Sequence, residues 1–181
     1  MANKEKKLEG QVIYDGKVVK LLLDKVLVPN GKEAYREIVS HNGGAAILCL
    51  NKDMQVLLIK QFRYAYNETI YEIPAGKLEK GEEPLEAAYR EFEEETGYKA
   101  NRLEYLGVIY PTCGYSNEKI YLYLALDFET SQTHFDEDEF IEAKFIDLEV
   151  VLKMISDGTI KDAKTICAIN YYLLKNGKLK C

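Results

Sequence analysis

Three glutamates near the middle of the chain have the spacing that brings carboxylates together on one side of a helix. Glu91, Glu94 and Glu95 are separated as i, i+3 and i+4, so on a helix their side chains converge on one patch. Like charges at this spacing repel each other, whereas a bound divalent cation offsets the repulsion because hard cations prefer carboxylate oxygens. The neighbouring Arg90 can brace one of the carboxylates by a bidentate contact. The spacing therefore predicts a carboxylate site for Mg²⁺ or Mn²⁺.

A single helix has to present these carboxylates. Pro84 suits the first helical position, and Gly97 suits the residue that caps the C-terminal end of a helix. Between them Leu85, Ala88 and Phe92 recur at helical spacing, which predicts that this side of the helix faces the core. The remaining acidic residues of the helix, Glu83, Glu86 and Glu93, are interpreted as an ordinary solvated face.

Short alternating segments, separated by turns rich in Gly, Asn and Asp, predict strands on both sides of this helix. The expected strands are 11–14, 18–23, 34–39, 45–50, 56–61, 69–73, 105–110, 120–128 and 142–147, followed by helices at 148–156 and 162–174. Strands before and after a helix, with helices at the end, indicate a mixed α/β sandwich. The first three strands form a small separate antiparallel sheet. We therefore expect an N-terminal β-sheet segment at 1–41 and a main domain at 42–181.

The composition of the chain limits which kinds of molecule it can be expected to bind. The net charge is −6, from 30 acidic and 24 basic residues, which argues against a nucleic-acid partner because such proteins carry a basic face. No apolar run reaches the roughly 20 residues that span a membrane. The scattered cysteines form no CxxC pair, and the charged start lacks a secretory signal, which favours reduced thiols in a cytoplasmic protein. With only two histidines, metal binding falls to carboxylates.

The glutamate cluster is part of a longer pattern that resembles the Nudix box. That box is Gly, five residues, Glu, seven residues, then Arg-Glu, an apolar residue, any residue, Glu-Glu, any residue, Gly and an apolar residue. It is matched here by Gly76, Glu82, Arg90, Glu91, Phe92, Glu94, Glu95, Gly97 and Tyr98. The resemblance implies a Nudix-type α/β/α sandwich with a mixed sheet, and a site holding two to three Mg²⁺ or Mn²⁺ ions.

The resemblance also assigns roles to residues of the box. The implied metal ligands are the backbone carbonyl of Ala75 and the side chains of Glu91, Glu94 and Glu95. The implied structural supports of the site are Gly76, Glu82, Arg90 and Gly97. Two neighbouring ions can bridge the attacking water and the diphosphate of a substrate.

Beyond the box, the chain resembles the ADP-ribose pyrophosphatase branch of that family. The segments that carry this resemblance are 36–41, 61–64, 71–77 and 158–165. It implies hydrolysis of ADP-ribose to AMP and ribose 5-phosphate by a homodimer that exchanges its N-terminal sheet. Arg63 and Glu72 then match substrate-contacting positions, and Arg36 reaches the site from the partner subunit. For Arg63 alone, a surface arginine at the end of a strand is the alternative interpretation.

The acidic stretch at 136–139 resembles the loop that supplies the general base in this branch. A carboxylate there could take a proton from a metal-polarised water. We favour Glu139, with Glu137 as the alternative, and we count Glu94 with them as catalytic. An ordinary solvated loop is the competing interpretation of either residue by itself.

One departure affects the choice of substrate. The branch usually has proline in a Ser-Pro-Gly turn past the box, whereas this chain has Cys113 there, before the substrate-binding candidate Gly114. The cysteine removes the usual diagnostic for ADP-ribose, so other nucleoside diphosphate sugars such as GDP-mannose or ADP-glucose stay open. A non-catalytic, nucleotide-sensing Nudix domain is the third hypothesis. It is disfavoured because every box glutamate is present.

Overall fold

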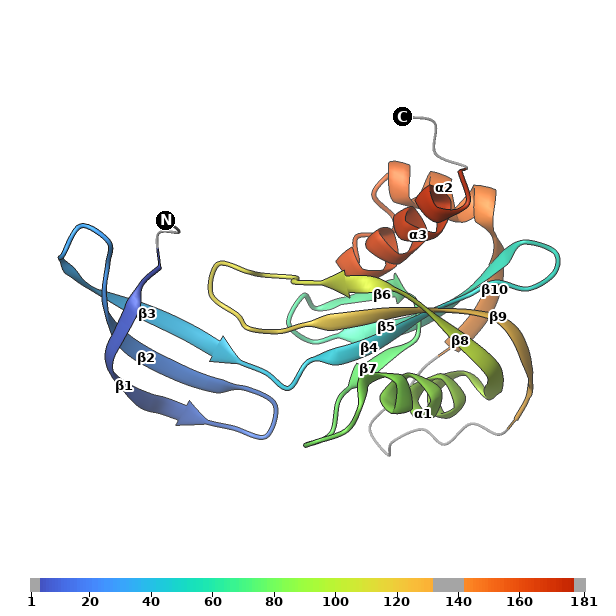
Figure 1. Ribbon diagram of the computed structural model, residues 1–181. Helices are drawn as coiled ribbons and strands as arrows, with labels where there is room; N and C mark the ends of the chain where they lie inside the picture. The colour runs from blue at the N-terminus through green and yellow to red at the C-terminus, as the bar shows by residue number, and fades with distance from the viewer. Residues whose placement is uncertain (1–3, 132–141, 178–181) are drawn as a thin grey trace. The chain divides into compact units, whose positions relative to one another are not determined.

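The chain divides into two compact units in the computed structural model, which describes residues 4–131 and 142–177 (Figure 1). The first unit comprises residues 1–43 and 110–119, and the second comprises 44–109 and 120–181. Each is described by itself.

Two sheets and three helices form the second unit. The sheets contain β4 (Gly44–Cys49), β5 (Gln55–Arg63), β6 (Glu68–Glu72), β7 (Ala75–Lys77), β8 (Tyr98–Ile109), β9 (Ile120–Thr130) and β10 (Glu142–Asp147). The helices are α1 (Pro84–Thr96), α2 (Leu148–Ser156) and α3 (Ala163–Lys175). One sheet has the order β7-β4-β9-β8, and the other has the order β10-β5-β6. The first is mixed because β4 and β9 run parallel while its other pairs are antiparallel.

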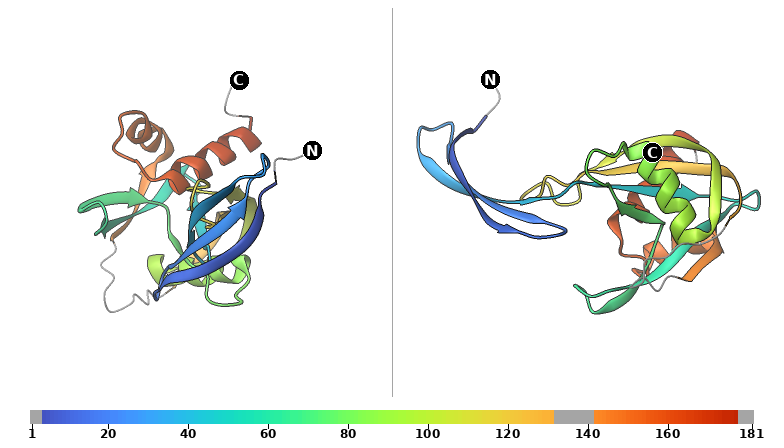
Figure 2. Two further views of the ribbon diagram at one scale, coloured as in Figure 1. Left: turned by 90° about the vertical axis from the view of Figure 1, so that its left-hand side faces the viewer. Right: turned by 90° about the horizontal axis from the view of Figure 1, so that it is seen from below.

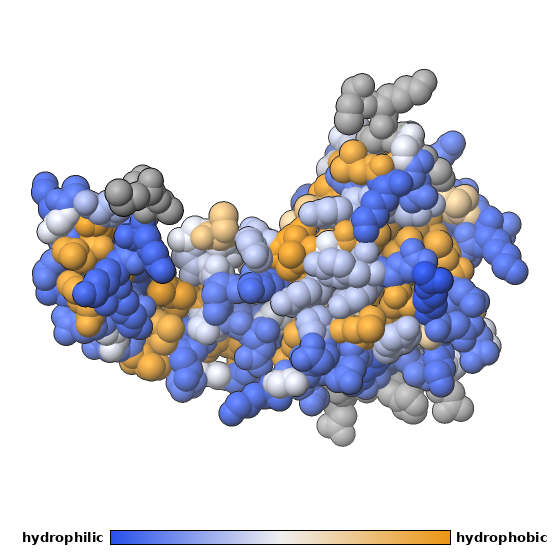
Figure 3. Space-filling view, in the orientation of Figure 1, coloured by the Kyte–Doolittle hydropathy of each residue, from blue (hydrophilic) through white to orange (hydrophobic). Residues whose placement is uncertain are grey.

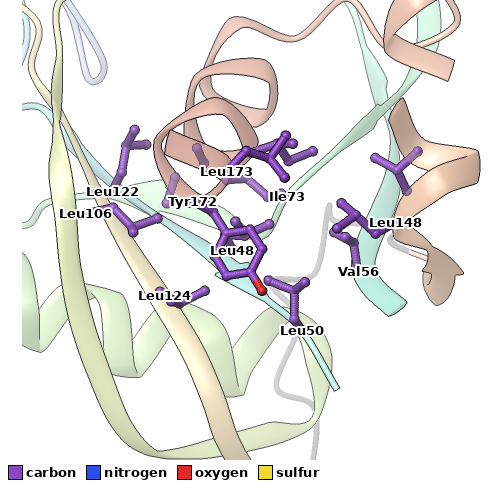
Figure 4. Close-up of a cluster of buried hydrophobic side chains, with 14 of the residues drawn as sticks. Leu48, Leu50, Val56, Ile73, Leu106, Leu122, Leu124, Leu148, Tyr172 and Leu173 are labelled. Atoms are coloured by element: carbon purple, nitrogen blue, oxygen red, sulfur yellow. The ribbon is translucent and has the colours of Figure 1, made fainter. Parts of the chain in front are cut away.

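The strand β4 lies between two hydrophobic clusters. Its residue Leu48 packs in one cluster with Tyr172 and Leu173 of α3 (Figure 4), and Ala46 belongs to the same cluster. Its residues Ala45, Ile47 and Cys49 alternate with these and pack in the other cluster with Phe92 of α1. Because successive side chains of a strand point to opposite faces, helices cover both faces of the sheet. The expected α/β/α sandwich with a mixed sheet is confirmed.

The helix α1 has the expected bounds. Pro84 begins it, and Gly97 ends it in the left-handed conformation with φ 69, its N–H donating to the Glu93 carbonyl. Ala88 and Phe92 are buried as expected, but Leu85 is 43% exposed, so that part of the prediction was wrong. The buried stretch starts at Ala87, which shows that the first turn extends past the packed surface. No helix within the described residues is long and apolar enough to cross a membrane.

Several strands extend past their expected bounds, such as β1 (Lys6–Asp15) for 11–14 and β2 (Lys20–Leu27) for 18–23, and two others, β7 and β8, differ more. The short strand β7 was not predicted, and it exists because Ala75 to Lys77 pair with β4. The strand β8 begins at Tyr98 rather than at 105, since its first residues pair with the end of β9 through several register shifts. In both cases the partner strand, and not local periodicity, determines the structure.

The first unit contains a three-stranded antiparallel sheet, as expected (Figure 2). Its strands are β1 (Lys6–Asp15), β2 (Lys20–Leu27) and β3 (Glu33–Ser40). The segment 110–119 joins it, because the Val39 N–H donates to the Tyr115 carbonyl at 2.8 Å and the Asn117 N–H donates to the Val39 carbonyl at 3.2 Å.

Every residue of β1 is exposed, and apolar side chains lie at the surface of this sheet (Figure 3). They include Leu8, Val12, Ile13, Tyr14 and Tyr35. Exposed apolar surface of this kind is typical of an interaction face.

Candidate active site

The loop before α1 brings the backbone of β7 against the glutamates of the helix. The Ala75 N–H donates to a carboxylate oxygen of Glu95 at 2.9 Å, and Glu95 is only 4% exposed. A Cβ placed on Gly76 would lie 1.8 Å from the carboxyl carbon of Glu91. Glycine is therefore required for the Glu91 carboxylate to reach this strand. The structure thus gathers Ala75, Gly76, Glu91 and Glu95 at one place.

Arg90 connects the cluster to the preceding loop. Its Nη1 donates to Glu91 at 2.8 Å and to Glu94 at 3.0 Å. Its Nε donates to Glu82 at 3.0 Å, and its Nη2 donates to Glu82 at 3.1 Å and to the Lys77 carbonyl at 3.3 Å. The hydrogen bond to Glu82 is the largest of several contacts that raise the pKa of Arg90. The guanidinium therefore stays charged and balances part of the negative charge of the cluster.

Glu82 closes the loop on the other side of Arg90. One of its carboxylate oxygens also accepts the Glu79 N–H at 2.8 Å. The hydrogen bond from Arg90 lowers the pKa of the Glu82 carboxyl, with a smaller contribution from the Glu79 backbone. These contacts hold the loop before α1 in one conformation, as expected if Glu82 supports the site structurally.

The residues present suit a hard divalent cation. Three carboxylates and the Ala75 backbone lie together, and hard cations take oxygen ligands of this kind. Within residues 4–131 and 142–177, no three His, Cys, Asp or Glu side chains already form a ready metal-ligand group. Arg90 bridges Glu91 and Glu94. A cation at this place would share these carboxylates with Arg90.

A second group of charged residues lies on β5 and β6. The Arg63 guanidinium donates to the Glu72 carboxylate through Nε at 2.6 Å and Nη2 at 2.8 Å. Burial raises the pKa of the Glu72 carboxyl, but the hydrogen bond from Arg63 and the charge of Lys164 oppose this effect, and the pKa is lowered overall. Glu72 is therefore a charged residue that is only 1% exposed. Arg63 is the last residue of β5 and its side chain is 37% exposed, and it is paired with this buried carboxylate.

This second group is close enough to the glutamate cluster to interact with it. The hydrogen bond to Glu72 contributes most to the raised pKa of Arg63, and the charge of Glu95 contributes as well. The Arg63 side chain is also partly exposed.

Residues at the start of α3 complete the second group, and the sequence analysis assigned them no role. The Lys164 ammonium contacts Glu72 and donates to Asp162 at 3.0 Å. The Thr165 hydroxyl accepts the Ile73 N–H at 2.8 Å. One feature of the sequence could have indicated them: a lysine in the first turn opposes the helix dipole. This signal is weak, and it does not identify Glu72 as the partner.

The remaining candidate residues belong to the first unit or fall outside the described residues. Arg36 belongs to the first unit, where its Nε donates to Glu5 at 2.9 Å and its Nη1 donates to the Tyr35 carbonyl at 2.9 Å. Gly114 also belongs to the first unit, and a Cβ there would meet nothing within 4 Å. Glu137 and Glu139 lie outside the described residues.

A mixed sheet between helices, with a glutamate-bearing helix held against a glycine strand, is an arrangement that suits a divalent cation. A family model described as NUDIX domain matches residues 40–169. Its span begins at the last residue of β3 and ends within α3, so it includes the glutamate cluster and the residues Arg63, Glu72 and Lys164. The chain belongs to the NUDIX family.

Several relatives match far beyond the box. An ADP-ribose pyrophosphatase of Bacillus subtilis is 43% identical over 173 residues, which cover 94% of each chain. A methanol dehydrogenase activator of Bacillus methanolicus is 39% identical over 173 residues, again covering 94% of each. A GDP-mannose pyrophosphatase of Citrobacter koseri is 35% identical over 146 residues, covering 75% of this chain and 76% of the relative.

A solved structure supports the fold. The crystal structure of an ADP compounds hydrolase superposes with a TM-score of 0.83 at 20% identity, covering 97% of each chain. The fold of the whole chain, including the N-terminal sheet, therefore has a counterpart in a known structure.

Proposed function

We propose that this chain is a metal-dependent pyrophosphohydrolase that cleaves ADP-ribose to AMP and ribose 5-phosphate. The observation that carries the proposal is the gathering of Glu91 and Glu95 against Gly76 and Ala75, with Glu94 joined to Glu91 through Arg90. The substrate is supported by the ADP-ribose pyrophosphatase of Bacillus subtilis, which aligns along nearly the full length.

The residues of the site divide into those that hold cations and those that hold the substrate. Glu91, Glu94, Glu95 and the Ala75 carbonyl would hold two to three Mg²⁺ or Mn²⁺ ions. Such ions polarise water and neutralise charge on a diphosphate. Arg63, paired with Glu72, presents its remaining N–H groups to the anionic part of the substrate. Gly114 is proposed as a further substrate-binding residue on the resemblance alone.

The chemistry is a hydrolysis at one phosphorus. The oxygen of water forms a bond to that phosphorus while the bridging P–O bond breaks, and the leaving phosphate oxygen takes the electron pair. A carboxylate of the acidic stretch, Glu139 or alternatively Glu137, accepts the proton from the water. Glu94 is counted as catalytic together with Glu137 and Glu139, because it would hold a cation that polarises the reacting groups.

The proposal is tested by measuring AMP release from ADP-ribose with excess Mg²⁺, beside GDP-mannose, ADP-glucose and NADH under the same conditions. We expect kcat/KM for ADP-ribose to exceed the others by at least about tenfold, or roughly 1.4 kcal/mol of discrimination. Equal kcat/KM values for all four compounds, or a preference for GDP-mannose, would mean that the chain is a hydrolase with a substrate other than ADP-ribose. The absence of any cleavage would instead favour a nucleotide-sensing domain.

We also propose that residues 1–41 are exchanged in a homodimer, while 42–181 form the Nudix domain. The exposed apolar side chains of the first sheet support this, because such surface favours association. Arg36 of one subunit would then contribute to the site of its partner. The free thiols of Cys49, Cys113 and Cys167 suit the reducing cytoplasm, where we place the enzyme.

Gel filtration tests the homodimer. We expect elution at twice the chain mass of 20.7 kDa, and a shift to the monomer position for Ile13→Glu, which places a charge on the exposed face of β1. Lys6→Gln on the same strand also lowers the net charge by one unit and is the control for the change in charge. Monomeric elution of the wild type would remove Arg36 from the site.

A further inference from the structure

We propose that Lys164 is a positioning residue for substrate binding: it holds Glu72 in place, and Glu72 in turn fixes the guanidinium of Arg63. The inference rests on the proposed function, because it deepens the role of Arg63 in the same site. Lys164 itself is 9% exposed and acts through its neighbours.

The geometry of the two strands makes Arg63 dependent on Glu72. Ile59 of β5 stands opposite Glu72 of β6 in the antiparallel register, and Arg63 lies four residues further along β5. Alternation puts Ile59 and Arg63 on the same face. The arginine side chain therefore runs back along its strand to reach Glu72, and its end is fixed there by two hydrogen bonds. Movement of the Glu72 carboxylate would move the guanidinium with it.

Lys164 and Arg63 hold the same carboxylate. The Lys164 ammonium contacts Oε2 of Glu72, the oxygen that also accepts from Arg63 Nη2. Asp162 in turn accepts from Lys164 at 3.0 Å, so the ammonium is fixed from its other side. The result is a chain of alternating charges that runs from α3 to Arg63. Cooperative networks of this type orient their members more strictly than single pairs do.

The next residue of α3 stabilises the backbone beside Glu72. The buried Thr165 hydroxyl accepts the Ile73 N–H and donates to Asp162 at 2.6 Å. Two consecutive residues of α3 thus hold two consecutive residues of the segment that leads into Ala75. The Thr165 contact holds the backbone next to Glu72. The Lys164 contact holds the Glu72 carboxylate itself.

A second lysine provides a matched control. Lys161 pairs with Glu68 at 2.8 Å, so it also joins the segment before α3 to a glutamate of β6. That pair is exposed, with side-chain exposures of 60% and 49%. Exposed pairs of this kind hold their partners weakly. Lys161→Met therefore repeats the substitution without disturbing Glu72.

The experiment is a double-mutant cycle between Lys164→Met and Arg63→Gln, with kcat and KM measured for ADP-ribose. We expect Lys164→Met to raise KM about tenfold while kcat changes less than about threefold. Lys164→Arg should restore KM to within about threefold of the wild type, and Lys161→Met should leave both constants unchanged. In the Arg63→Gln background, Lys164→Met should have no further effect on KM, because the group it positions is already gone.

Two results would overturn the inference. The first is a KM for Lys164→Met equal to that of the wild type, and the second is an effect of the same size with and without Arg63. If Lys164→Met does not fold, as judged by circular dichroism, Lys164→Gln retains a donor to Glu72 and takes its place in the cycle. If the wild type releases no AMP from ADP-ribose, the proposed function fails. In that case the Kd for ADP is measured by calorimetry for each variant of the double-mutant cycle. Failure of the proposed function can then be told apart from failure of the Lys164 inference.

Discussion

Replacing Glu94 with glutamine is expected to lower kcat/KM for ADP-ribose by more than about 100-fold while leaving the fold intact. The amide retains an oxygen that accepts from Arg90, so the contact at 3.0 Å can persist. It loses the negative charge that would bind a cation. Because the Glu94 side chain is 38% exposed, its neutral replacement leaves no buried group without a partner. The measurement is steady-state kinetics at increasing Mg²⁺, with thermal unfolding recorded for the same samples.

The control for this prediction is Glu86→Gln on the same helix. Glu86 belongs to the first turn of α1 and was interpreted as part of the solvated face. We expect its kinetics to match the wild type, and both variants to keep their Tm within about 4 °C. Unchanged turnover in Glu94→Gln and in the equivalent Glu95→Gln would refute the assignment of the metal site. Loss of turnover in Glu86→Gln would show that charge on the helix matters in general.

Replacing Gly76 with alanine is expected to cause a comparable loss of activity, more than about 100-fold, for a steric reason. The new methyl group would occupy the position of the Glu91 carboxylate, whose atoms lie 1.8 to 2.1 Å from it. The end of a flexible side chain can move away, so we expect a modest loss of stability, about 1–3 kcal/mol. Gly76 does not have positive φ, so backbone strain does not contribute. Activity should therefore fall far more than stability.

The background Glu91→Ala tests the mechanism of this effect. If Gly76→Ala acts by displacing Glu91, adding it to Glu91→Ala should change neither activity nor stability much further. Chemical denaturation gives the free energies of unfolding, and the AMP assay gives kcat/KM. Additive losses in the double variant would mean that the alanine disturbs β7 or its pairing with β4 instead.

The sequence by itself determined the helix and the class of chemistry. Pro84, Gly97 and the spacing of Glu91, Glu94 and Glu95 are local features, and local features act through the backbone of a few neighbouring residues. They fixed the bounds of α1 and the shared side of its glutamates. The box pattern also indicated the family, since its fixed residues lie within one strand–loop–helix segment.

The tertiary structure decided the features that depend on residues far apart in the chain. Leu85 has the angular position of a core residue, yet it is exposed because the first turn of α1 extends beyond the packed surface. The strand β7 is too short to show any period, and it forms because β4 pairs with it.

The pair of Lys164 and Glu72 joins residues 92 positions apart. Its stability comes from the shared burial of charges that α3 and β6 bring together, and no local pattern specifies that approach. Periodicity and capping act over a few residues of one element, whereas burial and charge pairing depend on which elements meet. For this reason the sequence predicted the carboxylates that would bind metal, while the tertiary structure showed what holds Arg63 beside them.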